Sequence, residues 1–146
     1  MQNQADINKI IDESLRVIHI PDGVEVKRQF KQIPLLRVDV NQLKGVFQNL
    51  AKNAVDAMDQ NGTLTIVTRE EDGSVEVAFK DTGKGITEEV RSQLFKPFFS
   101  TKIKGMGIGL AICQKFVQAH NGTINVESEV DKGSTFTVKL PIEYKK

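Results

Sequence analysis

The spacing of apolar residues along the chain predicts about three long helices. Apolar side chains recur at steps of three and four residues, the pattern of a helix with one buried face. Asp6 and Asp39 precede the first two of these stretches and are suitable N-caps, because a short carboxylate accepts hydrogen bonds from the first backbone N–H groups of a helix. The predicted helices, in chain order, cover 7–18, 40–59 and a stretch from about Gly107 to the turn at Asn121-Gly122.

Alternating apolar and polar residues predict about five strands and a short extended piece at 35–38. The predicted strands are 24–30, 63–69, 74–80, 123–129 and 134–140. The turns Glu71-Asp72-Gly73 and Asp131-Lys132-Gly133 join neighbouring strands as hairpins. Thr87 is placed to cap a short helix that ends at about Leu94. We therefore expect one α+β domain over 1–146, a two-layer sandwich in which a mixed, mostly antiparallel sheet packs on the helices.

Composition narrows the function classes. The 146 residues carry a formal net charge of +1, which gives no overall attraction to nucleic acid or to an anionic membrane. We therefore expect neither as a partner, and an anionic ligand would have to be held by local groups. The single cysteine, Cys113, excludes an internal disulfide, and we expect a cytoplasmic location.

Asn49 and Asn53 lie four residues apart in the second predicted helix and so share one of its faces. Their amide oxygens are suitable ligands for Mg²⁺. The alternative is that both are solvated side chains on an amphipathic helix.

The loop Asp81-Thr82-Gly83-Lys84-Gly85-Ile86 follows a predicted strand. Its glycines permit a flat ligand to approach the backbone closely, and Asp81 is placed to accept a hydrogen bond from an amino group such as that of adenine. An ordinary glycine-rich turn remains the alternative.

Two further clusters follow. Phe95-Lys96-Pro97-Phe98-Phe99 leads into Lys102, which would suit a phosphate. The stretch 105–112 places glycines at alternate positions just before a helix, where free N–H groups bind anions. It is neither a Walker A loop nor a dinucleotide fingerprint, because Leu110 stands where the latter has its last glycine.

In this order the clusters resemble the boxes of the catalytic domain of sensor histidine kinases, a Bergerat-type ATPase fold shared with DNA gyrase and the heat-shock ATPase chaperones. The matching segments are the N box 49–58, the G1 box 81–86, the F box and ATP lid 95–105, the G2 box 105–112 and a weaker G3 box 133–136.

The resemblance implies a role for each matched residue. Asn53 matches the ligand of Mg²⁺, with Asn49 one turn earlier, and Asp81 matches the reader of the adenine amino group. The other implied nucleotide contacts are Gly83, Gly85, Ile86, Lys102, Gly105, Gly107, Gly109, Leu110 and Ser134.

The resemblance also implies that the domain binds MgATP and transfers the γ-phosphate to a histidine on a separate dimerisation domain, which then serves a response regulator receiver domain. Hydrolytic relatives carry a glutamate as general base where this chain has Asn49. Many members have Lys or Arg where this chain has Asp56, and this departure resembles the nitrogen-regulator-type branch. A serine-directed kinase or weak ATPase of the same fold, and a non-catalytic nucleotide-binding module, remain alternatives.

The two histidines do not match a phosphoacceptor. His19 lies at a helix end, and His120 lies in the last turn of the third helix, where a cation suits the helix dipole. We expect both to be structural, and we expect the chain to be a fragment of a longer kinase.

Overall fold

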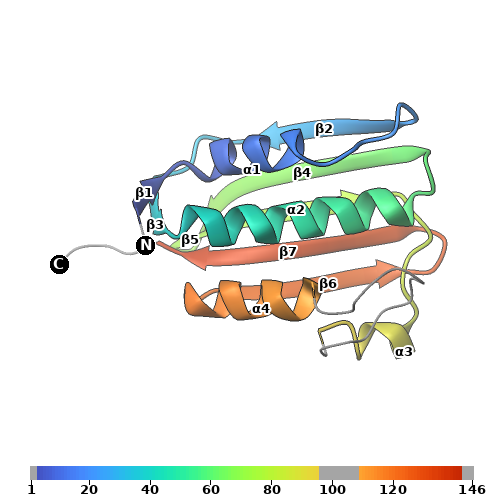
Figure 1. Ribbon diagram of the computed structural model, residues 1–146. Helices are drawn as coiled ribbons and strands as arrows, with labels where there is room; N and C mark the ends of the chain where they lie inside the picture. Colours follow the sequence, from blue (N-terminus) through green and yellow to red (C-terminus); the bar gives the residue numbers. More distant parts are fainter. Residues whose placement is uncertain (1–2, 96–108, 143–146) are drawn as a thin grey trace.

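The computed structural model describes residues 3–95 and 109–142. Three helices, α1, α2 and α4, lie on one face of a five-stranded sheet, and the short α3 lies at one end (Figure 1). The helices are α1 Ile7–Arg16, α2 Val40–Ala57, α3 Glu88–Arg91 and α4 Gly109–Ala119. The strands are β1 Asn3–Ala5, β2 Val24–Phe30, β3 Leu36–Val38, β4 Gly62–Glu71, β5 Ser74–Asp81, β6 Thr123–Glu129 and β7 Gly133–Pro141.

The sheet has the strand order β2-β4-β5-β7-β6. β2 pairs with β4 in parallel, and the other neighbours are antiparallel. The β4–β5 hairpin turns through Asp72 and Gly73, with φ of 52° and 78°, as the tight turns that suit the twist of a hairpin require. The predicted α+β sandwich with a mixed, mostly antiparallel sheet is confirmed.

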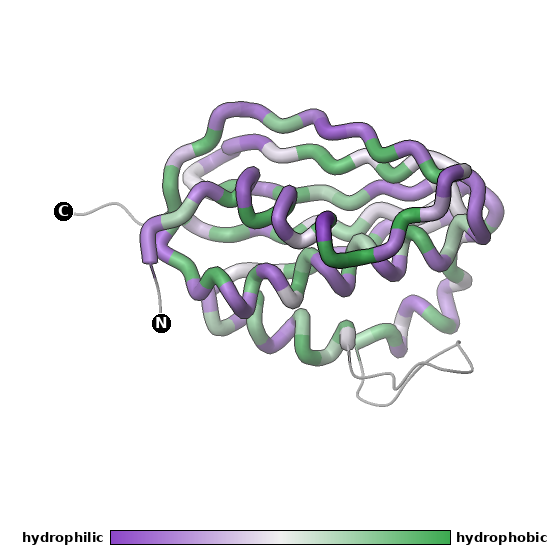
Figure 2. Tube along the Cα trace, turned by 45° about the horizontal axis from the view of Figure 1, so that its top comes forward, coloured by the Kyte–Doolittle hydropathy of each residue, from purple (hydrophilic) through white to green (hydrophobic). Residues whose placement is uncertain are grey.

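α1 and α2 begin where the sequence predicts. Asp6 accepts a hydrogen bond from the Asn8 backbone N–H at 2.9 Å, and Asp39 accepts one from Gln42 at 3.0 Å. The buried residues of α1, α2 and α4 are mostly apolar, and hydrophobic and hydrophilic residues alternate along the tube in Figure 2. The buried apolar side chains of α2 are Leu43, Val46, Phe47, Leu50, Ala51, Ala54 and Val55.

The helix-covered face of the sheet is apolar in its middle and polar at one end. One row of cross-strand neighbours consists of Ile66, Phe79, Phe136 and Val126, all buried. The next row on this face begins with Leu64 and continues with Asp81, Ser134 and Ser128. We call the last three residues the polar row. It places three polar side chains next to a row of buried apolar ones, and buried polar side chains call for an explanation.

Several elements differ from the prediction, and α1 ends at Arg16 instead of Ile18. β1 was not predicted, and it pairs with β3 in a small separate sheet. α2 ends at Ala57 because Asp59 and Gln60 already adopt positive φ, 49° and 74°, before Asn61-Gly62 is reached. α3 ends at Arg91 instead of Leu94.

Among residues 3–95 and 109–142, the helices are too short or too polar for any of them to traverse a lipid bilayer.

Candidate nucleotide-binding site

Asp81 is the charged residue at the centre of the candidate site. It ends β5 and is only 2% exposed. Its Oδ1 atom accepts hydrogen bonds from the backbone N–H groups of Gly83 at 2.9 Å and Ser134 at 3.3 Å. The described part of the chain supplies no hydrogen bond to its other oxygen, Oδ2. The fold therefore fixes one oxygen through two backbone N–H groups and leaves the other without a hydrogen bond from the described residues.

The environment of Asp81 makes its charged form less favourable than it is in water. Burial raises the pKa of this carboxyl group, and the hydrogen bonds from Gly83 and Ser134 oppose the rise only in part. A buried carboxylate with few donors is unusual in a purely structural position. Such perturbed acids mark candidate functional sites.

The loop that follows Asp81 lies against the end of α2. The Lys84 N–H donates to the Ala57 carbonyl oxygen at 3.2 Å. At Gly83, a Cβ atom would lie 2.5 Å from the same oxygen. A residue with a side chain therefore cannot take this place without moving the backbone.

The same loop is tied to the β6–β7 turn on its other side. The Asp131 N–H donates to the Lys84 carbonyl at 2.7 Å. Gly85 has φ of 74°, and a Cβ there would lie 2.1 Å from the Glu129 carbonyl oxygen. Gly83 and Gly85 thus allow close backbone packing on both sides of the loop. Their contact with a nucleotide stays a prediction.

Ser128 joins this loop to the polar row. Its Oγ accepts a hydrogen bond from the Ile86 N–H at 2.6 Å and lies 2.8 Å from the Ser134 Oγ and 3.2 Å from the Gly133 carbonyl. Ser128 is not among the site residues predicted from the sequence. Alternation along β6 places Ser128 on the same face as the buried Ile124 and Val126, and the cross-strand register shows its position beside Ser134.

One face of α2, which carries the N box, contacts both the start of α4 and the loop after β5. Asn49, Asn53 and Ala57 recur at four-residue steps and so form a stripe on this face. At one end of the stripe, a Cβ at Gly109 would lie 2.8 Å from the Asn49 Oδ1, so the start of α4 lies against this side chain. At the other end, Ala57 contacts Gly83 as described above. Asn53 lies between these two contacts and is half-buried.

Asn49 has its own partner within the helix. Its Nδ2 donates to the Gly45 carbonyl at 2.9 Å. This bond uses the donor end of the amide and leaves the oxygen toward Gly109. No group of three or more His, Cys, Asp or Glu side chains able to hold a metal occurs among the described residues.

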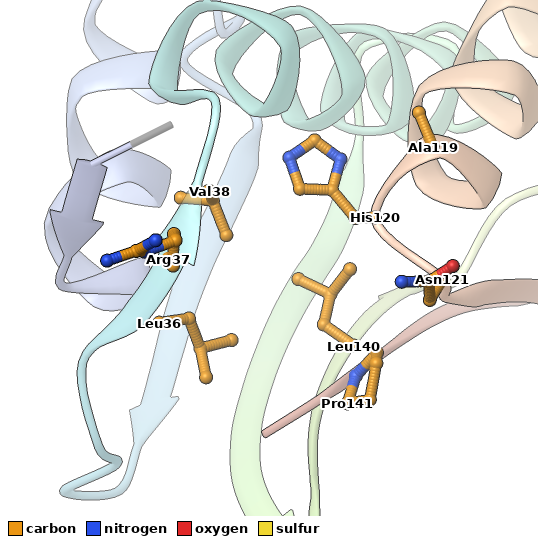
Figure 3. Close-up of a pocket in the computed structure, with 8 residues that line it drawn as sticks. All are labelled: Leu36, Arg37, Val38, Ala119, His120, Asn121, Leu140 and Pro141. Atoms are coloured by element: carbon orange, nitrogen blue, oxygen red, sulfur yellow. The ribbon is translucent and has the colours of Figure 1, made fainter. Parts of the chain in front are cut away.

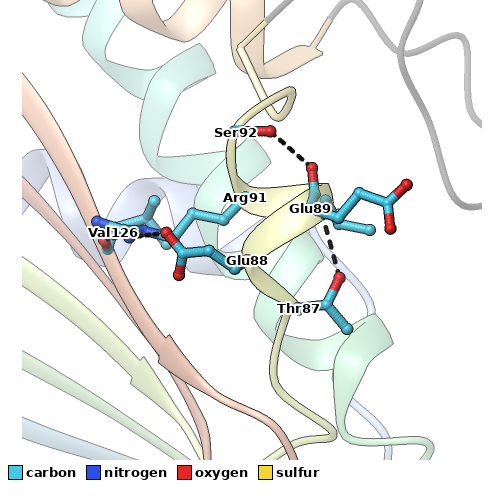
Figure 4. A network of polar contacts seen from close by, with 7 residues as sticks. Thr87, Glu88, Glu89, Arg91, Ser92 and Val126 are labelled. Atoms are coloured by element: carbon cyan, nitrogen blue, oxygen red, sulfur yellow. Dashed lines mark hydrogen bonds and ion pairs between the residues drawn. The ribbon is translucent and has the colours of Figure 1, made fainter.

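α3 is held at the edge of the sheet by polar contacts, since none of its residues is buried. Figure 4 shows Arg91 reaching β6, where its Nε donates to the Val126 carbonyl at 3.1 Å. The Thr87 Oγ1 caps the helix by accepting from the Val90 N–H at 3.2 Å. The segment after the candidate loop is therefore fixed to β6 at a second point.

The predicted site residues divide into two sets. The structure brings Asp81, Gly83, Ile86 and Ser134 into one hydrogen-bonded cluster with Ser128, and it sets Asn49 beside Gly109. Leu110 packs toward the core. Lys102, Gly105, Gly107 and the F box after Phe95 lie outside the described residues.

His120 and Cys113 are both buried, in keeping with the structural roles that the sequence predicts. Its Nε2 accepts from the Asp39 N–H at 3.0 Å, and its Nδ1 lies 2.7 Å from the Phe116 carbonyl. With Nε2 as the acceptor, Nδ1 is the ring nitrogen that donates to the Phe116 carbonyl. Burial raises the pKa of the Cys113 thiol to about 12, which makes this sulfur unreactive.

His120 also faces a small hollow, which Figure 3 shows between β3, the end of α4 and β7. It is lined by Leu36, Arg37, Val38, Ala119, Asn121, Leu140 and Pro141. This hollow lies at the other end of β7 from Ser134 and contains none of the predicted site residues.

Residues 38–144 match the family described as histidine kinase-, DNA gyrase B- and HSP90-like ATPase. Among curated relatives, sporulation kinase C of Bacillus subtilis is 38% identical over 140 residues, which are 94% of this chain and 33% of the relative. Sensor histidine kinase ZraS of Klebsiella oxytoca is 40% identical over 143 residues, or 94% of this chain and 31% of the relative.

Solved structures agree with the sequence match. The catalytic domain of histidine kinase ThkA superposes with a TM-score of 0.83 at 27% identity, covering 97% of this chain and 95% of that one. The mycobacterial sensor histidine kinase MprB gives 0.86 at 26% identity, covering 97% of both chains. The chain spans about a third of the length of the curated relatives above. It belongs to the family of histidine kinase-, DNA gyrase B- and HSP90-like ATPases.

Proposed function

We propose that this chain is the catalytic domain of a sensor histidine kinase, which binds MgATP and donates the γ-phosphate to a histidine on a separate dimerisation domain. The observation that carries the proposal is the buried Asp81, with one oxygen fixed by two backbone N–H groups and the other unengaged. The relatives named sensor histidine kinases and sporulation kinases support the direction of the reaction.

The chemistry of the site suits adenine. A carboxylate oxygen accepts hydrogen bonds, and adenine presents an amino group where guanine presents an acceptor oxygen. Asp81 Oδ2 would therefore favour adenine over guanine. Gly83 and Gly85 would keep the loop close to the base, and the half-buried Ile86 offers an apolar contact. A full-length ShkA structure containing AMPPNP, which superposes with a TM-score of 0.84, supports an adenine nucleotide.

The stripe on α2 is suited to the phosphates and their metal. The Asn53 amide oxygen would hold Mg²⁺, since Mg²⁺ prefers oxygen ligands. When bound, the ion neutralises charge on the triphosphate. Gly109 at the start of α4 would offer backbone N–H groups to the phosphates, together with Lys102, Gly105 and Gly107 from the adjoining segment.

Asn49 favours transfer over hydrolysis. Hydrolysis needs a base that takes a proton from water. An amide cannot do this, and the Nδ2 of Asn49 is already bonded to its own helix. The γ-phosphate would thus be kept for an acceptor histidine and passed to a receiver domain. The solved complex of ThkA with the response regulator TrrA supports such a partner.

The test is to mix this chain and γ-labelled ATP with a separate histidine-bearing dimerisation domain of a related kinase. We expect label on that domain that is labile to acid and stable to alkali, the behaviour of phosphohistidine. Label on serine, or rapid release of free phosphate, would indicate a serine kinase or an ATPase. Normal nucleotide binding without transfer would indicate a non-catalytic module.

A further inference from the structure

Ser128 is a polar residue at the site that belongs to none of the five boxes. It lies on the edge strand β6 and is half-buried. Its side chain stands on the helix-covered face, in the same row as Ser134 and Asp81. The residue two places earlier on this face, Val126, is apolar and buried. A hydroxyl here therefore breaks the pattern of its own strand.

The three polar contacts of Ser128 use its whole hydrogen-bonding capacity. A serine hydroxyl donates one hydrogen bond and accepts two. One assignment satisfies all contacts: Ser128 donates to the Gly133 carbonyl and accepts from the Ile86 N–H and the Ser134 hydroxyl. The short 2.6 Å bond from Ile86 N to Ser128 Oγ fixes the far end of the loop 81–86.

These contacts continue to the carboxylate. Ser134, the neighbour of Ser128, donates its backbone N–H to the Asp81 Oδ1. Gly83, at the near end of the loop, donates to the same oxygen. Ser128 thereby links the end of the loop to the strand that holds the carboxylate. Removing its hydroxyl would free Ile86 and Ser134 to move relative to one another.

We propose that Ser128 is a positioning residue for base recognition: its hydroxyl sets the loop 81–86 relative to Ser134, so that Asp81 and Ile86 keep the geometry that selects adenine. This inference rests on the proposed function, because it takes the nucleotide to bind at Asp81. Ser128 itself need not contact the nucleotide.

The test compares three replacements of Ser128. Ser128→Ala removes the hydroxyl, Ser128→Cys keeps nearly the same size with a poor acceptor, and Ser128→Thr keeps the hydroxyl on a residue that suits a strand. Thr68→Val is the matched control, because Thr68 is a buried hydroxyl on the same sheet face that bonds Asn8 and Lys31 away from the site. The readouts are the dissociation constants of MgATP and MgGTP and amide hydrogen exchange at Ile86.

We expect Ser128→Ala to weaken MgATP binding about three- to tenfold, the effect of one lost hydrogen bond, with a smaller effect on MgGTP. The preference for ATP falls, and the Ile86 amide exchanges faster. Ser128→Cys should also lower the preference for ATP, whereas Ser128→Thr should keep the preference of the unchanged chain. Thr68→Val lowers stability but leaves the preference unchanged.

An unchanged preference for ATP in the Ala and Cys variants would overturn the inference, as would an equal loss in Thr68→Val. Each of these results counts only while Asp81→Asn still weakens ATP binding. If Asp81→Asn also has no effect, the proposed nucleotide site itself fails, so the two failures are distinguishable.

Discussion

The burial of Asp81 makes its charge unfavourable for folding, and its carboxyl group has one oxygen that the proposed nucleotide would use. Its carboxyl group is buried in the polar row, where burial raises its pKa. Both hydrogen bonds to it reach the same oxygen, Oδ1. An asparagine could accept the same two bonds without carrying a charge. The acid is therefore expected to be less favourable for folding than its amide, and its value would lie in the free oxygen Oδ2.

The first prediction follows from the sign of this shift. The folded chain holds the Asp81 proton more strongly than the unfolded chain, so the stability due to this group is present below the unfolded pKa and is lost as the pH rises through the higher folded pKa. We expect Asp81→Asn, without nucleotide, to be more stable than the unchanged chain at neutral pH. The difference should shrink in the acid range. Urea unfolding across pH measures it, and a less stable variant at neutral pH would contradict this view of the site.

Asn53 gives a second prediction at this scale. If its amide oxygen holds Mg²⁺, Asn53→Ala should remove most of the dependence of ATP affinity on Mg²⁺. ATP titrations with and without the metal measure this, and Lys52→Ala, the exposed neighbouring residue, is the control. A variant whose affinity still responds fully to Mg²⁺ would place the metal elsewhere.

Among the elements, α2 sets the distance between the two ends of the site. Its stripe contacts the start of α4 at Asn49 and the loop after β5 at Ala57. These residues are eight positions apart, and a helix rises about 1.5 Å per residue. The rigid helix therefore keeps the two contacts about 12 Å apart, and Asn53 lies midway.

Two glycines of this region should respond in opposite ways to alanine. At Gly45, on α2, a Cβ would meet nothing within 4 Å, so Gly45→Ala should raise the free energy of unfolding by about 0.5–1 kcal/mol. At Gly83 the Cβ would lie 2.5 Å from the Ala57 carbonyl oxygen, so Gly83→Ala should lower both stability and nucleotide affinity. Denaturant unfolding of the pair tests this, and a stabilised Gly83→Ala would show that the loop does not pack against α2 as described.

His120 joins the ends of two helices. Its ring accepts from Asp39 at the start of α2 and donates to Phe116 in α4. His120→Ala should lower the free energy of unfolding by about 1–3 kcal/mol, because two polar groups near the core lose their partner. The exposed His19 provides the control, and His19→Ala should have little effect. Equal effects of the two substitutions would mean that the link contributes nothing.

At the scale of the whole molecule, the sequence predicts the elements better than their arrangement. Local signals place α2 and the hairpins, since spacing, caps and turn residues act over a few positions. β1 carries no such signal, because Asn3–Ala5 is short and largely polar. The parallel pairing of β2 with β4 and the register of the polar row depend on contacts between distant segments. The sequence motifs therefore predict Asp81 and Ser134 as site residues. The position of Ser128 beside them follows only from the strand register.

The arrangement of the molecule also explains why its parts form one site. The polar row lies at one end of the sheet, and the loop after β5, the β6–β7 turn and α2 all meet there. Because this chain spans about a third of its curated relatives, the acceptor histidine is proposed to come from another domain. The nucleotide site of this chain would bind the ATP whose phosphate is transferred.

The most direct test of this account is the affinity of the chain for MgATP with and without the Asp81 carboxylate. Titration with a fluorescent adenine nucleotide should show binding that Asp81→Asn weakens about ten- to a hundredfold, as expected for a hydrogen bond to a charged group. Asp22→Asn, at an exposed turn, should leave the affinity unchanged. An Asp81→Asn variant that binds MgATP as tightly as the unchanged chain would contradict the central claim.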